Sequence, residues 1–537
     1  MHKYIARLLH EAPWRNETAD SGESSVLYSN RQRSRVVPTI AFDCIRGFAA
    51  IQVYCGHYFS FFAKQHDRNA IHRYGQSLNQ ADFGGGNAVF MFFIMSGFLM
   101  QIGYSSKLPR LAKTNIFNSV VFEKAVHWWD FMKQRVARVT PLVWLSILIN
   151  IPFTIQGEKY GGGPSGLYVA YNDDYYGGGV SHSKTASGYL LYLFFLNDWP
   201  VTTMAVNPPL WTIFSQFFCY AFFPFIVGPF HTVRNTSRLV GEVTLAYAIY
   251  LVVFLYQFYW TNNPYVMDNY SDTHLNPVNK LPLFIMGCFF GSQTLTNLSV
   301  VKSEKYILYW SVVCNGLTMF MTLYCFLEVI LGFTVDGASY LMRIMGELFL
   351  PPLYGLWLYS FTQSPTCLAY RIFSWKPFKL LGTVSFAFYC LHWPLLTYYC
   401  WIRFGIKYWV LSTDATRLND WEVVPVGIMI LVISVLAYYF IEAPGRKFLQ
   451  KWIGKLLNVI VSALSVSESQ YSSVPHNVVV PMPMQLTSLL KEDNKKKTLP
   501  HGQLIRDNFN LDEEDLPVAH ALNITSSGSP MTINHWR

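Results

Sequence analysis

The chain has few charged residues. Of its 537 residues, 14% are Asp, Glu, Lys or Arg, whereas 52% are hydrophobic and 17% are aromatic. A soluble globular domain usually contains about 25% charged residues. This composition therefore excludes an ordinary cytosolic protein, and it also excludes a disordered or collagen-like chain. It predicts an integral membrane protein.

Other features are also scarce or missing. Nine cysteines in a chain of this length do not make a disulfide framework. Eight of them lie inside apolar runs, where a thiol is usually a small hydrophobic side chain. The sequence lacks Cys-x-x-Cys and His-x-x-Glu spacings, so we expect no metal site. It also lacks an internal repeat, which leaves the inverted-repeat pattern of many transporters unsupported.

Ten apolar runs are long enough to cross the hydrocarbon core of a bilayer, which takes roughly 20 residues per helix. They predict an all-α, polytopic membrane protein with about ten transmembrane helices. We expect a polar cytosolic segment over residues 1–36, a transmembrane domain over residues 37–448, and a largely disordered cytosolic tail over residues 449–537. The ten runs cover residues 37–63, 86–104, 137–156, 209–230, 239–260, 281–297, 306–331, 340–361, 380–403 and 422–441.

The positive charges predict how these helices are oriented. The chain has 41 Lys and Arg residues against 32 Asp and Glu residues, a formal net charge of +9. In the predicted topology, 20 of the basic residues lie on the N-terminal side of the membrane and 9, Lys280 among them, lie in loops on the other side. Because cytosolic loops are enriched in Lys and Arg, both termini are predicted to be cytosolic. The excess charge orients helices, so we expect no nucleic-acid partner.

The first apolar run contains three ionisable residues, Asp43, Arg46 and His57. A charged group at membrane depth costs at least about 2.5–3.5 kcal/mol, so it is a functional candidate. Asp43 and Arg46 are three residues apart and can pair. Arg46 and His57 share one helix face, with about 16 Å of rise between them. Either this face forms a site, or the arginine snorkels to the interface and the histidine is a hydrogen-bonded core residue.

Further candidates lie in later runs. Arg135 and Arg138 share a helix face at the cytosolic foot of the third run. Guanidinium groups in this arrangement can bind phosphate oxygens bidentately, although both residues could simply signal cytosolic orientation. His392 lies in the middle of the ninth run, where an isolated histidine is usually a satisfied core residue. Glu442 closes the last run and could form a plain ion pair at a helix end.

Six segments, in order along the chain, resemble the blocks of the acyltransferase type 3 family of polytopic membrane proteins. The first block contains Arg46 and His57 with ten residues between them, and the third contains the pair Arg135 and Arg138. Each block alone is weak evidence for the resemblance, but six blocks in the same order on ten predicted helices make a specific match. The blocks are residues 39–57, 92–99, 135–144, 207–224, 381–394 and 440–446.

The resemblance implies an enzyme that moves an acyl group, commonly acetyl, from cytosolic acyl-CoA to a hydroxyl of a glycan, a lipid or a small molecule. It implies that Arg46, Arg135 and Arg138 hold the phosphates of CoA. It also implies that His57 is the catalytic imidazole and that Asp43 orients Arg46. Contacts to the acceptor or to the thioester carbonyl are expected from Ser96, Trp211, Gln216, Tyr220 and His392.

The chain departs from the family pattern at three positions. Gln216 stands where the family usually has a glutamate, and a neutral amide cannot act as a general base. Cys44 replaces a glycine of the first block, and Phe90 replaces an acidic residue just before the second. Any acid–base role at position 216 is therefore not expected in this chain.

Two mechanisms are compatible with His57. It could be a general base that removes the acceptor's proton, or a nucleophile that carries the acyl group transiently. Two other classes of protein also stay open. One is a transporter in which Asp43, Arg46 and His57 line the path of a substrate or proton. The other is a non-catalytic membrane scaffold, a possibility that Gln216 keeps open.

Overall fold

The structure is a computed structural model. Within the stretches that it describes, the regular elements are helices, and an isolated bridge between Ala63 and Leu418 is the one β feature. The all-α class is therefore confirmed. The predicted N-terminal segment and residues 457–537 of the predicted tail lie outside these stretches. The described stretches are residues 39–63, 84–104, 117–159, 189–196, 207–230, 236–260, 277–297, 302–334, 338–405 and 417–456.

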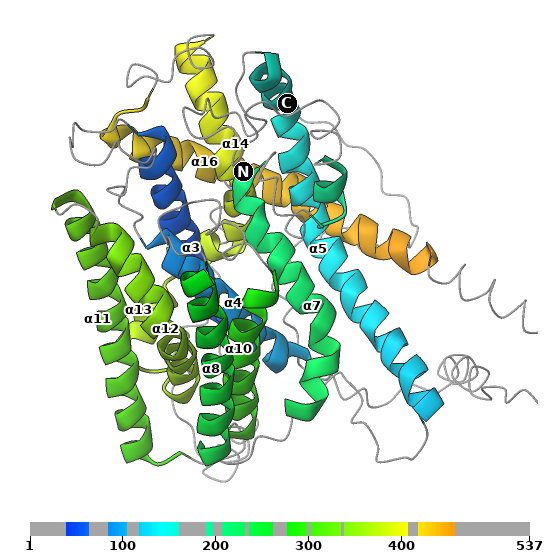
Figure 1. Ribbon diagram of the computed structural model, residues 1–537, viewed down its shortest axis with the longest axis vertical. Helices are drawn as coiled ribbons and strands as arrows, with labels where there is room; N and C mark the ends of the chain where they lie inside the picture. Colours follow the sequence, from blue (N-terminus) through cyan, green and yellow to red (C-terminus); the bar gives the residue numbers. More distant parts are fainter. Residues whose placement is uncertain are drawn as a thin grey trace, which may run out of the picture.

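The helices form one bundle (Figure 1), and each predicted apolar run coincides over most of its length with a helix. The helices are α3 (Ile40–His57), α4 (Gly85–Tyr104), α5 (Phe117–Lys159), α7 (Trp211–Phe230), α8 (Thr236–Trp260), α10 (Pro277–Asn297), α11 (Glu304–Thr334), α12 (Ala338–Gln363), α13 (Leu368–Phe373), α14 (Lys376–Phe404) and α16 (Val423–Ala437). Short 3-10 or π-helical turns adjoin some of them: η1 (Tyr58–Phe62), η3 (Pro208–Leu210), η5 (Asp420–Glu422) and η6 (Tyr438–Glu442).

Six helical stretches in the described part of the chain are long and apolar enough to cross a membrane. This confirms that the protein is a multi-pass integral membrane protein. The six stretches are Gly85–Tyr104, Phe131–Phe153, Thr236–Tyr256, Glu304–Leu331, Lys376–Phe404 and Asp420–Leu456.

Helices α3 and α14 pack side by side and run in the same direction. Glycines make this close approach possible. A Cβ atom at Gly382 would overlap the backbone carbonyl of Asp43, and one at Gly47 would press on the side chain of Leu381. Because a larger residue does not fit at either crossing, the depth of α3 relative to α14 is fixed.

Polar contacts hold the far ends of these two helices to the start of α16. The Tyr58 hydroxyl donates a hydrogen bond to the Asn419 carbonyl at 2.6 Å. Glu422 is fully buried, forms an ion pair with Arg403 of α14 and accepts a 3.0 Å hydrogen bond from Tyr399. Helices α3, α14 and α16 are therefore connected at this end by charged and polar groups.

Helix α4 lies between α3 and α10. Its crossing with α10 also depends on glycine, because a Cβ atom at Gly97 would overlap the carbonyl oxygen of Phe284. Helix α7 packs against α4, α5 and α10. Helices α3, α4, α5, α7 and α14 bring together the five sequence blocks that contain candidate site residues.

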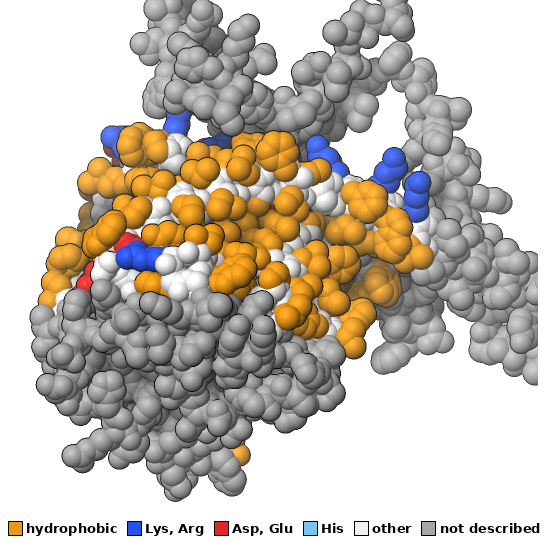
Figure 2. All heavy atoms as spheres, turned by 90° about the horizontal axis from the view of Figure 1, so that it is seen from above, with side chains coloured by type: hydrophobic (Ala, Val, Ile, Leu, Met, Phe, Trp, Pro, Cys, Tyr) orange, Lys and Arg blue, Asp and Glu red, His pale blue; other side chains and the backbone are white. Residues whose placement is uncertain are grey.

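The outward faces of the helices are apolar. On α11, the side chains of Leu308, Val312 and Met319 are 66%, 65% and 70% exposed. Figure 2 shows hydrophobic side chains over most of the described surface on one face, with only scattered Lys and Arg residues. An apolar surface of this extent is unfavourable in water. The surrounding lipid chains therefore cover it.

The last helix continues past Glu442 to residue 456. Lys447 and Lys451 are exposed along one side of this extension, and Phe448 and Trp452 are exposed beside them. Adjacent basic and aromatic stripes are typical of a helix that lies on a membrane surface.

Candidate functional site

The three arginines expected to bind phosphate come together at one end of the bundle. Arg46 on α3 forms an ion pair with Asp43, which confirms the pairing predicted from their spacing. Its electrostatic neighbours include Arg135 and Arg138 of α5 and Glu442 of η6. We call the end of the bundle that contains these five residues the arginine end.

Arg135 is the most firmly held of these arginines. It is 7% exposed and donates a 2.5 Å hydrogen bond to the hydroxyl of Tyr104, which in turn donates to Gln134 at 2.8 Å. The Nε atoms of Arg46 and Arg135 are both buried and make no hydrogen bond within the described residues. A buried donor without a partner costs about 1–3 kcal/mol. An anionic oxygen would satisfy these donors, so the arginine end fits a phosphate group.

Ser96 and Tyr220 belong to the arginine end as well. The Ser96 hydroxyl donates a 3.0 Å hydrogen bond to the Tyr220 hydroxyl, and both side chains are buried. Tyr220 interacts electrostatically with Arg135 and Arg138. Two residues expected to contact the acceptor or the carbonyl thus lie beside the phosphate-binding candidates.

Gln216 lies one helical turn further from the arginine end, about 6 Å along α7 from Tyr220. Its Nε2 donates to the Phe92 carbonyl of α4 at 3.5 Å. A carboxylate could not make this hydrogen bond, because it has no N–H to donate. The amide that departs from the family pattern therefore has a partner suited to it.

Farther from the arginine end, the beginning of the fourth sequence block packs against α14. Asn207 donates from Nδ2 to the Cys390 carbonyl at 2.9 Å, and the hydroxyls of Thr212 and Tyr389 lie 2.7 Å apart. All four residues are buried. These bonds fix the turn of α14 that positions His392.

His57 and His392 contact each other directly. The Nδ1 atom of His57 lies 2.8 Å from Nε2 of His392, and the ring planes are within 6° of parallel. Nδ1 of His392 lies 2.7 Å from the Tyr389 carbonyl oxygen. Because a carbonyl only accepts, this nitrogen donates its proton there, and Nε2 of neutral His392 is an acceptor. Nδ1 of His57 is then the donor, and in the neutral form of His57 this tautomer has no proton on Nε2.

Aromatic rings surround the two imidazoles. The ring centre of Trp393 lies 5.4 Å from that of His57, and the ring centre of Tyr54 lies 6.4 Å from that of His392. His392 is fully buried, whereas His57 is partly exposed. His392 is thus placed to orient its partner, and His57 is the imidazole that a ligand could reach.

The histidine pair and the arginine end share helix α3, which carries both Arg46 and His57. Helix α3 contacts α14 at two places: Asp43 packs against Gly382 beside the arginine end, and His57 contacts His392 at the histidine pair. The eleven residues from Arg46 to His57 correspond to about 16 Å of helix rise. The site is therefore elongated, with cations at one end and an unprotonated imidazole nitrogen at the other.

Sequence reasoning missed two features of this region. It treated His392 as a residue with a minor role, and only the structure shows its contact with His57. It also placed Lys280 in an outer loop, which is wrong. Lys280 lies in α10 and is 3% exposed, with Nζ 4.6 Å from the ring centre of Phe90 and 5.8 Å from that of Trp211. The apolar run that begins just after Lys280 does not reveal that the helix starts earlier.

Within the described stretches, no group of three or more His, Cys, Asp and Glu residues is arranged to hold a metal ion. The residues of the site instead offer guanidinium, hydroxyl, amide and imidazole groups. Such groups can bind anionic oxygens, form hydrogen bonds to a carbonyl and accept a proton.

Comparison with known proteins gives consistent matches. The family described as an acyltransferase domain matches residues 39–441, which is more than half of the chain. The YrhL protein of Bacillus subtilis (strain 168), whose name provisionally assigns it peptidoglycan O-acetyltransferase activity, is 22% identical over 439 residues, covering 78% of this chain and 56% of that protein. The peptidoglycan O-acetyltransferase OatA of Listeria monocytogenes serovar 1/2a is 26% identical over 130 residues, covering 24% of this chain and 18% of OatA. No solved structure matches significantly.

Proposed function

The chain belongs to the acyltransferase domain family, and we propose that it is a membrane O-acyltransferase that moves an acetyl group from cytosolic acetyl-CoA to a hydroxyl of an acceptor. The observation that carries this proposal is the hydrogen bond between His57 and His392. Family membership supplies the reaction class. The histidine pair supplies a nitrogen able to take a proton, and His57 lies on the same helix as Arg46 of the arginine end.

In this proposal, the arginine end binds the phosphates of CoA. The unpartnered Nε donors of Arg46 and Arg135 support this placement, as does the bidentate geometry with which guanidinium binds phosphate. The pantetheine arm separates the thioester of acetyl-CoA from its phosphates. A donor bound by Arg46, Arg135 and Arg138 could therefore extend along α3 toward His57.

His57 acts as the general base. Its Nε2 takes the proton of the acceptor hydroxyl while the hydroxyl oxygen attacks the thioester carbonyl. The ester forms, the carbon–sulfur bond breaks, and the imidazolium returns the proton to the leaving sulfur. His392 holds the other proton of His57 on Nδ1, and Asp43 orients Arg46.

The same unprotonated nitrogen could instead attack the carbonyl and carry the acetyl group as an acyl-imidazole. The hydroxyl would then attack in a second step. The general base requires fewer assumptions if donor and acceptor meet at His57. Acid-quenched enzyme that has turned over labelled donor distinguishes the two routes, because only the second attaches label to the chain.

We place the arginine end on the cytosolic side, with both termini cytosolic and about ten membrane spans within residues 37–448. The basic extension after Glu442 supports this orientation. Arg446 is an electrostatic neighbour of Arg135, and Lys447 and Lys451 follow on the same helix. Such residues favour the cytosolic face and its anionic lipids. Residues 1–36 and 449–537 would then be a cytosolic segment and a cytosolic tail.

For the acceptor, the names of the two relatives favour a glycan hydroxyl. Because the match covers only 56% and 18% of their lengths, the acceptor is a choice to be tested. Peptidoglycan fragments are the first probe, and membrane lipids are the second.

The test uses the purified full chain in nanodiscs with radiolabelled acetyl-CoA and these two acceptors. We expect label in one acceptor, and we expect His57→Ala to abolish the transfer while thermal unfolding stays unchanged. Arg238→Ala, on the exposed surface of α8, is the matched control and should transfer normally. Undiminished transfer by His57→Ala would refute the role of the imidazole. Solute flux into liposomes without acetyl-CoA would favour a transporter.

A further inference from the structure

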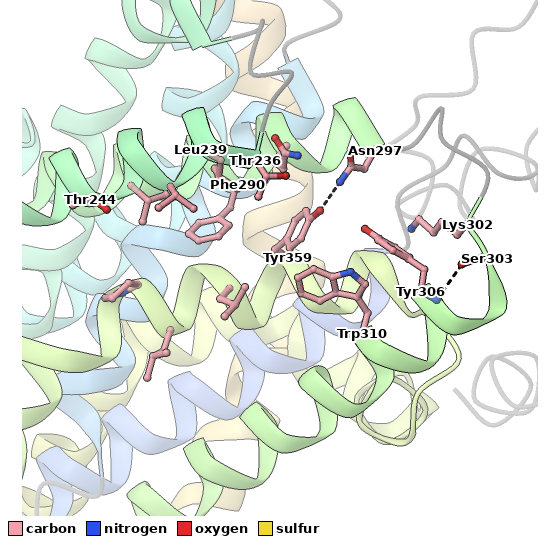
Figure 3. Close-up of a pocket in the computed structure, with 16 residues that line it drawn as sticks. Thr236, Leu239, Thr244, Phe290, Asn297, Lys302, Ser303, Tyr306, Trp310 and Tyr359 are labelled. Carbon is pink, nitrogen blue, oxygen red and sulfur yellow. Dashed lines mark hydrogen bonds between the residues drawn. The ribbon is translucent and has the colours of Figure 1, made fainter.

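A cavity of about 670 Å³ lies between α8, α10, α11 and α12 (Figure 3). Its volume is within the range of ligand sites, roughly 300–1,000 Å³. Every residue that lines it comes from these four helices or from the two residues just before α11. The cavity is therefore separate from the histidine pair on α3 and α14.

Apart from Thr244, the polar residues of the cavity lie toward one end of it (Figure 3). There α8 begins at Thr236, α10 ends at Asn297, and Lys302 and Ser303 precede α11. This is the same side of the bundle as the arginine end. Helix α10 follows α4, which ends at Tyr104, the hydrogen-bond partner of Arg135.

Lys302 is the one cation among the lining residues. Its ammonium donates to the carbonyls of Thr362 and Gln363 at 3.2 and 3.4 Å, where α12 ends. An ammonium has three donors, so one is left for a ligand. Figure 3 shows it pointing toward Tyr306 and the cavity. Burial lowers the pKa of Lys302, and an anion in contact with the ammonium would offset this cost.

Gln293 provides a second polar position, one helical turn deeper than Asn297. It is 4% exposed and lines the cavity, and its Oε1 accepts no hydrogen bond within the described residues. A buried amide oxygen needs a donor. A ligand hydroxyl at this depth would supply one.

The rest of the wall is apolar. Leu239 and Val243 of α8 face Phe290 of α10 and Leu353 of α12 across the cavity. Val240, on the rim, is 59% exposed, so the cavity opens onto the outer surface of the bundle. This surface is in contact with lipid, and a lipid could enter from the bilayer.

We propose that this cavity binds an anionic lipid that has a free hydroxyl next to its headgroup, as a monoacyl glycerophosphate has. The acyl chain lies against Leu239, Val243 and Leu353. The hydroxyl donates to Oε1 of Gln293, and the phosphate accepts from Lys302. A nucleotide such as the one in CoA carries several phosphate charges, and a single lysine that already bonds two carbonyls does not match them.

Binding is measured by native mass spectrometry on the purified full chain with three probes that share one oleoyl chain. The probes are 1-oleoyl lysophosphatidic acid, oleic acid and 1-oleoyl lysophosphatidylcholine. We expect lysophosphatidic acid to bind most tightly. Oleic acid lacks the hydroxyl, and the choline headgroup places a second cation near Lys302.

Three variants test the three contacts. Lys302→Gln should weaken the binding of lysophosphatidic acid about tenfold, the effect of losing one charged hydrogen bond. Lys305→Gln, on the exposed side of α11, should leave this binding unchanged. Gln293→Leu should remove the preference over oleic acid without changing oleic acid binding. Leu353→Trp should exclude all three probes, whereas Leu323→Trp on the outer face of α11 should exclude none. Thermal unfolding of each variant verifies folding.

Three outcomes would overturn the proposal. The first is equal affinity for lysophosphatidic acid and lysophosphatidylcholine. The second is an equal loss in Lys302→Gln and Lys305→Gln. The third is displacement of the bound lipid by CoA, which would identify a nucleotide site instead. Since the assay involves no acyl transfer, its failure is distinct from a failure of the proposed enzymatic function.

Discussion

Nδ1 of His57 and Nε2 of His392 lie 2.8 Å apart, although 335 residues separate them in the chain. This contact joins α3 to α14, and the hydrogen bonds of His392 determine which ring nitrogen donates. His392 donates to the Tyr389 carbonyl and accepts from His57. In neutral His57, the second nitrogen then carries no proton.

If His392 fixes this tautomer, removing its acceptor should slow the reaction without weakening donor binding. We expect His392→Leu to lower kcat about 100-fold, within the range attributed to a positioned acid–base group, with the KM for acetyl-CoA unchanged. His392→Gln retains an oxygen that can accept from His57 and should recover part of the rate. Steady-state kinetics on both variants measure kcat and the KM for acetyl-CoA separately. A change confined to KM would contradict this role.

Substitutions at the arginine end should weaken binding of the acetyl-CoA donor more than binding of the acceptor. Arg46→Ala and Arg135→Ala are each expected to raise the KM for acetyl-CoA about tenfold, since each removes a charge-assisted hydrogen bond. Arg135→Lys should recover little of this, because an ammonium lacks the guanidinium fork. Arg238→Ala serves as the control. If the KM for acetyl-CoA stays constant in all of them, the arginines only orient the helices in the membrane.

The glycine crossing between α3 and α14 should be sensitive to a single methyl group. Gly382→Ala places a Cβ atom against the carbonyl of Asp43, and overpacking of this kind costs about 1–3 kcal/mol. At Gly316 of α11 a Cβ atom would have no neighbour within 4 Å. Gly316→Ala should therefore be neutral or stabilising by about 0.5–1 kcal/mol. Thermal unfolding in detergent compares the two, and equal melting temperatures would mean that the crossing tolerates a wider spacing.

Glu422 should contribute to stability and not to chemistry. It is fully buried and pairs with Arg403, far from the arginine end. Breaking a buried pair on one side costs about 3 kcal/mol, so Glu422→Ala should lower the melting temperature. Glu304→Ala removes an exposed acid from the first turn of α11 and should change stability by less than about 0.5 kcal/mol. A loss of activity in Glu422→Ala at a temperature where it remains folded would show that the Glu422 carboxylate itself takes part in the reaction.

Much of the architecture could be predicted from the sequence, because it depends on local patterns. The apolar runs located the helices, and a spacing of three residues predicted that Asp43 and Arg46 pair. Periodicity also placed Arg46 and His57 on one face, which the shared helix α3 retains. These inferences concern residues within a single helix, where the geometry is fixed by the rise and turn per residue.

Contacts between helices could not be predicted in this way. No pattern in the sequence indicates that His392 lies beside His57, since helical periodicity says nothing about the partner across a crossing. Ser96 and Tyr220 were candidates for the same reason as His392, yet the packing of α4 on α7 places them with Arg135. Lys280 was assigned to a loop because it precedes an apolar run, whereas the structure places it inside α10 with its ammonium over the rings of Phe90 and Trp211.

The glycine crossing also has a mechanical consequence. Because α3 and α14 are locked together at Gly47 and Gly382 and again at the two imidazoles, they should move as one rod. A shift of Arg46 on binding a phosphate would then be transmitted to His57 as a change in tilt, without any relay of side chains. A path to the imidazole would then open by movement of the surrounding helices, such as α7. The two histidines would keep their contact throughout a turnover.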